Sequence, residues 1–143
     1  MLVAPTQTGQ EGLNHVMTPH LVWHENEHAE VHSVDELDLL IDQLTIQAQQ
    51  TMPFSIELSV NNETGLLVVV GCEESHMEFY SAQSKPPILG CVGPWDDDEL
   101  IVFSQRGHYS EMYKRYCVPI TEARKALRQY FQTGMRPDNI MWA

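Results

Sequence analysis

The sequence has 143 residues, a length typical of one domain, and 43% of them are hydrophobic, as in ordinary globular proteins. Twenty acidic residues against eight basic ones give a formal net charge of -12, and the first 84 residues contain no Lys or Arg. This charge excludes nucleic acid and anionic membranes as partners and favours a cationic one, although acidity can also serve solubility alone.

The chain begins with a stretch that has no regular pattern. Residues 1–18 are polar, contain Gly and Pro and show no hydrophobic periodicity, so they predict a flexible N-terminal tail. The remaining residues, 19–143, predict a single domain. Its first element is a β-hairpin, because short strand-forming segments at residues 20–24 and 29–32 flank a polar turn.

A helix is predicted directly after this hairpin. Ser33 and Glu36 have the spacing of a capping box, in which side chains accept hydrogen bonds from free amides of the first turn. Hydrophobic residues then recur at helical spacing, which predicts one buried face. The helix should end near Gln49 or Gln50, since Pro53 cannot continue it.

Three consecutive segments then predict an antiparallel meander. Residues 54–60 alternate between hydrophobic and polar side chains, residues 66–70 are hydrophobic throughout, and residues 76–81 alternate again. Alternation is typical of a strand with one wet face, and an unbroken hydrophobic run is typical of a strand covered on both faces. Two further strands are predicted at residues 88–92 and 100–104.

The C-terminal part predicts a second helix over residues 121–133, with Gly134 as its C-cap and Pro137 preventing its continuation. Residues 139–142 predict a short edge strand, whereas residues 106–115 are polar and aromatic and favour neither a strand nor a helix. The chain therefore predicts an α+β domain, in which a mostly antiparallel sheet of about six strands carries two helices on one face.

Targeting signals and cysteine usage both favour a reducing compartment. No hydrophobic run approaches the roughly 20 residues of a membrane helix, and residues 1–10 lack the basic and apolar regions of a signal peptide. Cys72, Cys91 and Cys117 are widely spaced and form no CxxC pair, which favours buried, reduced thiols. We therefore expect a cytoplasmic protein, and we expect a monomer or a weak dimer.

Histidines recur every four residues near the N-terminus, at His20, His24, His28 and His32. On a helix this spacing would align four imidazole rings as a transition-metal site, but the segment predicts a hairpin, on which a cross-strand pair would bind a metal weakly. The alternatives are a metal-binding or metal-responsive protein, a pH-sensitive patch and ordinary surface histidines. The spacing matches no specific metal signature, so we assign no metal and no cofactor.

Trp95 is followed by four consecutive carboxylates, Asp96 to Glu99. The segment lacks the DxDxDG spacing of a calcium loop, and consecutive side chains diverge too much for hydrolysis by paired carboxylates. Two alternatives are left open, a solvated turn and a contact loop for another protein. An aromatic side chain beside several charges is typical of a protein interface.

Signatures of catalysis are missing from the sequence. It has no GxSxG, HExxH, P-loop or GxGxxG motif, and it lacks the PCxxC element of zinc deaminases. His108 and Ser110 lie close together but have no third member of a triad. We therefore assign no catalytic residues and predict a protein that is not an enzyme, with a hydrolase using His108 or His76 beside a carboxylate as the alternative.

Several segments resemble the Imm1 family of immunity proteins. The family's closing pattern is similar to Val118-Pro119-Ile120, the helix after it, the turn Thr133-Gly134-Met135-Arg136-Pro137 and a final strand with Trp142. The family's first helix is similar to Ser33-Val34-Asp35-Glu36-Leu37-Asp38-Leu39-Leu40. The strands between them have a similar order and length, so the resemblance covers residues 20–143, with the His-rich first hairpin as a departure.

The resemblance implies an immunity protein of a bacterial polymorphic toxin system, which binds a toxin encoded beside it and neutralises the toxic domain in the cytoplasm. Several such toxins are deaminases or nucleases, and an enzyme that acts on nucleic acid needs a cationic groove for phosphates. We therefore hypothesise that carboxylates of this chain occlude such a groove. The candidate partner-binding residues are Glu73, Glu74, Trp95, Asp96, Asp97, Asp98 and Glu99.

Overall fold

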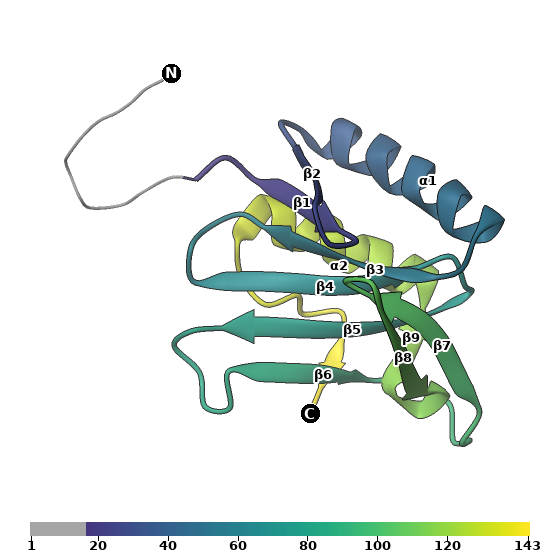
Figure 1. The fold of residues 1–143 in the computed structure, drawn as a ribbon. Helices are drawn as coiled ribbons and strands as arrows, with labels where there is room; N and C mark the ends of the chain where they lie inside the picture. Colours follow the sequence, from purple (N-terminus) through teal and green to yellow (C-terminus); the bar gives the residue numbers. More distant parts are fainter. Residues whose placement is uncertain (1–16) are drawn as a thin grey trace.

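The computed structural model describes residues 17–143, so the predicted tail lies almost wholly outside the described residues. Two α-helices and ten strands form this part of the chain (Figure 1). They are β1 (His20–Trp23), β2 (Glu27–Glu30), α1 (Val34–Gln50), β3 (Phe54–Ser59), β4 (Thr64–Val70), β5 (Glu74–Ser81), β6 (Ile88–Val92), β7 (Leu100–Gln105), β8 (His108–Tyr113), the 3₁₀-helix η2 (Lys114–Tyr116), β9 (Cys117–Pro119), α2 (Ile120–Thr133) and β10 (Met141–Trp142).

Seven strands follow one another in the order β10-β6-β5-β4-β3-β1-β2, and each pair of neighbours is antiparallel. Strand β9 pairs with β5. The β7–β8 hairpin joins the sheet through a parallel bridge between Phe54 of β3 and Ser104 of β7. The predicted α+β class, with a mostly antiparallel sheet, is therefore confirmed.

The prediction of about six strands is wrong, because the sheet has ten; two of them, β8 and β9, lie in segments to which the sequence assigned no strand. Strand β8 lies in the segment that favoured neither a strand nor a helix. Arg106 and Gly107 form its two-residue turn with φ of 53° and 86°, and two positive φ angles are typical of a type I′ turn. Such turns are usually signalled by Asn-Gly or Asp-Gly, and an arginine in the first position conceals the signal.

Both helices pack on the same face of the sheet, as predicted, and share one core with it; Figure 1 shows α2 lying behind the strands. The strands alternate, so that every second side chain enters this core. On β3, β4 and β5 these side chains are Phe54, Ile56, Leu58, Leu66, Val68, Val70, Met77 and Phe79. The helices add Leu37, Ile41, Leu44, Ala48, Ala123, Ala126, Leu127 and Tyr130.

The helix ends follow the predicted signals. The Glu36 amide donates to Ser33 Oγ at 3.0 Å, and Glu36 Oε1 accepts from the His32 amide at 2.8 Å. Helix α1 ends at Gln50, and Gly134 caps α2 in the left-handed conformation with φ of 69°. Neither of these two helices is long and apolar enough to cross a membrane.

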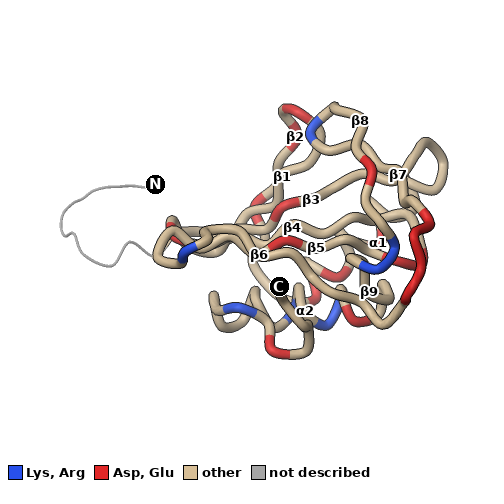
Figure 2. Tube along the Cα trace, turned by 90° about the horizontal axis from the view of Figure 1, so that it is seen from below, with Lys and Arg blue, Asp and Glu red and all other residues tan. Residues whose placement is uncertain are grey.

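The second face of the sheet is only partly covered. The β7–β8 hairpin lies on this side, opposite α2, as the view along the sheet in Figure 2 shows. Ile101 and Phe103 of β7 and Val69 of β4 are buried but do not belong to the main core. The hairpin therefore covers one part of this face with apolar side chains, and we call the uncovered part the open face.

Replacement of Ser33 by Ala tests the N-cap of α1. Ser33→Ala should lower the free energy of unfolding by about 1 kcal/mol, because the Glu36 amide loses its hydrogen-bond acceptor. Urea denaturation followed by circular dichroism would measure the change. Gln132→Ala on the exposed side of α2 is the control and should stay within about 0.5 kcal/mol of the unaltered chain. Equal effects of the two substitutions would contradict the capping role.

Candidate interaction site

Six predicted carboxylates gather at one end of the sheet, and we call them the acidic cluster: Glu73, Glu74, Asp96, Asp97, Asp98 and Glu99. Two of them stand where β4 turns into β5, and four lie on the loop before β7, which Figure 2 shows as a red run at the edge of the molecule. Lys114 joins the two groups, since its Nζ lies 3.8 Å from Glu74 Oε2 and 3.6 Å from Glu99 Oε1.

The loop over residues 93–99 is held in place although it has no regular secondary structure. The Gly93 amide donates to the Arg115 carbonyl at 2.8 Å, and the Lys114 amide donates to the Glu99 carbonyl at 2.8 Å. The Arg115 guanidinium also forms an ion pair with Asp98. A side chain at position 93 would collide with the carbonyl oxygen of Cys117, so only glycine allows this close approach.

The acidic cluster keeps a negative charge after its internal ion pairs are counted. Among residues 17–143, Lys114 and Arg115 are the two cations that contact it, so its six carboxylates retain four negative charges against them. Asp96, Asp97 and Glu73 are exposed and form no ion pair within residues 17–143. Carboxylates without an internal partner are the ones available to cations of another molecule.

Trp95, the aromatic residue predicted for this site, is less accessible to a partner than the exposed carboxylates are. Trp95 is half-buried, and Lys114 Nζ lies 5.3 Å from the centroid of its ring, a cation–π contact. This contact helps to fix the loop, so part of the tryptophan surface is used within the chain. Glu73 and Glu74 in addition line an open cleft of about 640 Å³ between the two helices, together with Gln49 and Arg124.

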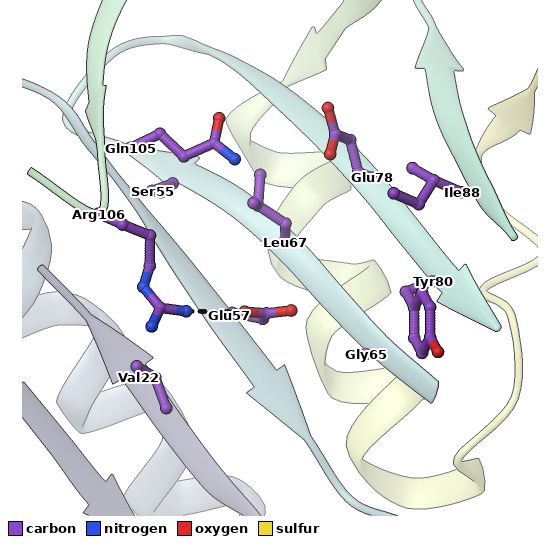
Figure 3. A pocket seen from close by; sticks show the side chains of 10 residues that line it. All are labelled: Val22, Ser55, Glu57, Gly65, Leu67, Glu78, Tyr80, Ile88, Gln105 and Arg106. Atoms are coloured by element: carbon purple, nitrogen blue, oxygen red, sulfur yellow. Dashed lines mark ion pairs between the residues drawn. The ribbon is translucent and has the colours of Figure 1, made fainter. Parts of the chain in front are cut away.

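A second hollow lies on the open face, beside the tip of the β7–β8 hairpin, and has a volume of about 210 Å³ (Figure 3). Glu57, Leu67 and Glu78 are cross-strand neighbours on β3, β4 and β5, which places both carboxylates on its floor with a leucine between them. Arg106 reaches in from the hairpin turn, with Nη1 3.6 Å from Glu57 Oε1. The hollow therefore already contains a cation for one of its two carboxylates.

His76 lies two residues before Glu78 on the same face of β5 and satisfies part of the hydrolase alternative, because it stands beside a carboxylate. Its Nε2 lies 3.0 Å from Glu78 Oε2, and its Nδ1 lies 2.7 Å from the Tyr116 carbonyl oxygen. Only an imidazolium can donate to both acceptors. Because the side chain is 4% exposed and both nitrogens are engaged, His76 joins β5 to η2 and has no free nitrogen to accept a substrate proton.

These contacts shift the pKa values of both partners. Burial alone lowers the pKa of His76, but its hydrogen bonds with Cys91, Glu78 and Tyr116 outweigh burial and raise the pKa to about 10. The hydrogen bond from His76, opposed by burial, holds the pKa of Glu78 below its usual value. The pair is therefore ionised at neutral pH on both sides.

The four predicted histidines do not converge on one point. His20 and His28 are on the paired strands β1 and β2, whereas His24 occupies the turn, with its ring centroid 4.5 Å from that of Phe54. His32 contacts two carboxylates, at 3.4 Å from Glu30 and 3.2 Å from Glu36. Within the described part of the chain, no three His, Cys, Asp or Glu side chains are grouped to hold a metal ion.

All three cysteines carry free thiols. Cys91 and Cys117 are buried as predicted, and Cys72 is only half-buried. Burial, together with nearby negative charge, raises the pKa of Cys117 to about 12. Burial also raises the pKa of Cys72, to which Glu74 adds. Thiols with a raised pKa are poor nucleophiles, so neither provides a reactive group.

The cations that organise these sites were not predicted from the sequence. Lys114 and Arg115 are separated from the acidic loop by a whole hairpin, and their pairing depends on the unassigned strand β8. The single signal was the position of two bases directly after an aromatic segment. Glu57 and Glu78 were visible as polar positions of alternating strands, but the register that aligns them was not.

Stability at alkaline pH tests the buried ion pair. Folded His76 keeps its proton up to about pH 10, and unfolded His76 loses it near 6.5, so the free energy of unfolding should fall as the pH rises between these values. The slope should reach up to about 1.4 kcal/mol per pH unit for one proton. Urea denaturation of the unaltered chain and of His76→Gln, from pH 6.5 to 9, would measure it. An equal slope in both proteins would contradict the assignment.

Comparison with protein families identifies what kind of chain this is. Residues 25–143 match the family described as "Immunity protein Imm1". A search of curated proteins found no match to the sequence. The family match covers most of the chain, including every element from β2 to β10, and it supports a role in immunity with a cognate toxin as the partner. The chain therefore belongs to the Imm1 family of immunity proteins.

Proposed function

We propose that this protein neutralises a toxin domain that acts on nucleic acid, a deaminase or a nuclease, by covering the cationic site where that domain binds its substrate. The observation that carries the proposal is the acidic cluster, in which six carboxylates around two cations retain four negative charges. An enzyme that binds nucleic acid contacts phosphates through lysine and arginine. Carboxylates held at a spacing similar to that of the phosphates can form ion pairs with the same lysine and arginine side chains.

The rigid attachment of the cluster favours such a role. Lys114 and Arg115 fix the acidic loop through two ion pairs and two backbone hydrogen bonds, so the loop needs little ordering when a partner binds. Asp96, Asp97 and Glu73, which have no ion-pair partner in the described part of the chain, then face solvent. Charges of this kind mainly raise the association rate and select the partner.

The proposed setting is the cytoplasm of the producing cell, with the protein acting as a monomer or a weak dimer. Glu73, Glu74, Trp95, Asp96, Asp97, Asp98 and Glu99 are the proposed contact residues. Lysine and arginine side chains of the toxin would meet the carboxylates, and the exposed part of Trp95 would add apolar contact.

Co-expression tests the proposal as a whole. The probe is the toxin domain encoded by the gene adjacent to that of this chain, produced in bacteria with and without the chain. The chain should restore growth, and the purified proteins should form a complex from which an oligonucleotide substrate of the toxin is excluded. A complex that still binds the oligonucleotide with unchanged affinity would contradict occlusion, and failure to restore growth would contradict immunity against this toxin.

Charge reversal tests the acidic cluster. Asp96→Lys with Asp97→Lys should slow association with the toxin domain about tenfold at low salt, because two unpaired carboxylates become cations. Stopped-flow or surface plasmon resonance would measure the rate. Asp98 is left intact, since its ion pair with Arg115 holds the loop.

The control for this variant is Glu63→Lys with Asp138→Lys, which changes the net charge equally. Both residues are exposed: Glu63 lies in the turn between β3 and β4, at the opposite end of the strands from Glu73, and Asp138 lies beside α2, where its amide donates to Gln129 Oε1 at 3.2 Å. The control should associate at nearly the original rate. Equal slowing by both variants would show that net charge acts and that the cluster has no special part.

A further inference from the structure

The β7–β8 hairpin presents an exposed apolar surface. We call it the hairpin patch: Leu100, Val102, Tyr109 and Tyr113, which are 46%, 36%, 68% and 47% exposed. Scattered exposed hydrophobic residues are normal on a soluble protein, but four on one two-stranded unit form a contiguous surface. Apolar surfaces of this kind, and tyrosines in particular, are typical of protein interfaces.

The register of the hairpin explains why these side chains lie together. Leu100 pairs with Tyr113, Val102 with Glu111, and Ser104 with Tyr109. Cross-strand partners lie on the same side of a two-stranded sheet, and this side alternates along each strand. The residues between them, Ile101 and Phe103, point the other way and are 8% and 1% exposed. One side of the hairpin is therefore used for folding, and the opposite side faces solvent.

The patch is held rigidly in place. The Ser104 amide donates to the Pro53 carbonyl at 2.9 Å, and the two-residue turn at Arg106 and Gly107 gives the strands a defined twist. At its tip the turn packs close to the β1–β2 turn, since a Cβ at Gly107 would lie 3.2 Å from Glu25 Cγ. Side chains on such a support lose little conformational entropy when they are covered, which favours tight binding.

The charges around the patch indicate the chemistry of its partner. Glu111 lies between Tyr109 and Tyr113 on the same side of β8 and accepts a hydrogen bond from Tyr109 Oη at 2.6 Å. At the other end, Leu100 directly follows Glu99 of the acidic cluster. Two aromatic rings beside a carboxylate suit a guanidinium or ammonium group, which stacks on the ring and pairs with the carboxylate.

We infer that the hairpin patch is the apolar anchor of the toxin complex and receives a surface of the toxin that presents arginine or lysine among apolar side chains. The inference rests on the proposed function and deepens it, because carboxylates set rate and specificity whereas buried aromatic contacts provide most of the affinity. A second copy of this chain fits less well, since pairing two patches would bring two acidic surfaces together, each with Glu111 and the acidic cluster.

The test is the double variant Tyr109→Ala with Tyr113→Ala, titrated with the purified adjacent-gene toxin domain by isothermal calorimetry. Affinity should fall by at least about 30-fold, the effect of losing interface hot spots, while growth protection weakens in parallel. The matched control removes exposed apolar side chains elsewhere: Ile46→Ala on α1 and Met135→Ala after α2, which are 55% and 69% exposed. The control should bind as the unaltered chain does.

Each outcome decides a different claim. If the unaltered chain binds the toxin and the tyrosine variant binds equally well, with an unchanged thermal unfolding midpoint, the inference is overturned and the proposed function stands. If the unaltered chain itself fails to bind, the proposed function is overturned. If the tyrosine substitutions abolish self-association seen by analytical ultracentrifugation and leave toxin affinity intact, the patch is an interface between copies, and the inference is likewise overturned.

Discussion

Burial of the inner side of the β7–β8 hairpin is the interaction on which the proposed interaction site depends. Phe103 and Ile101 are removed from water there, and the parallel bridge from Phe54 to Ser104 gives the hairpin its one strand contact with the sheet. The acidic loop directly precedes β7 and Lys114 directly follows β8. Attachment of the hairpin therefore fixes both partners of the ion pair between Lys114 and Glu99. If the hairpin were loosely attached, neither the acidic cluster nor Tyr109 and Tyr113 of the hairpin patch would have a fixed position.

The first 84 residues contain no Lys or Arg, but this separation of charges along the sequence is not kept in the folded protein. Early carboxylates and late cations meet across the fold: Arg124 lies 2.6 Å from Asp42, and both Arg124 and Arg128 contact Asp38. Two arginines of α2 thus neutralise two of the four carboxylates of α1, and these ion pairs fasten the two helices to each other. Net negative charge is left where carboxylates outnumber the cations beside them, as in the acidic cluster before β7.

Local sequence signals predicted most of the helical layer and the central meander. Ser33, Gly134 and the alternation of β3 and β5 depend on neighbours within a few residues, so they could be predicted without knowing the fold. Pairings between distant segments could not. The turn at Arg106 carries a positive φ on a residue that rarely adopts it, and the union of Glu74, Glu99 and Lys114 appears only after β5, β7 and β8 are in register.

Two exposed strand edges of the sheet carry different side chains. One edge is β2, at the end of the seven-strand order, and the other is β8 of the hairpin. Strand β2 is four residues long and exposes Glu27, His28 and Glu30, so a neighbouring copy approaching edge to edge would meet like charge and little apolar surface. The edge at β8 has a different composition, since β8 pairs only with β7 among the described strands and carries Tyr109 and Tyr113 with Glu111 between them. Edge-to-edge contact with another chain is therefore disfavoured at β2, whereas β8 offers aromatic side chains to a partner that complements its carboxylate.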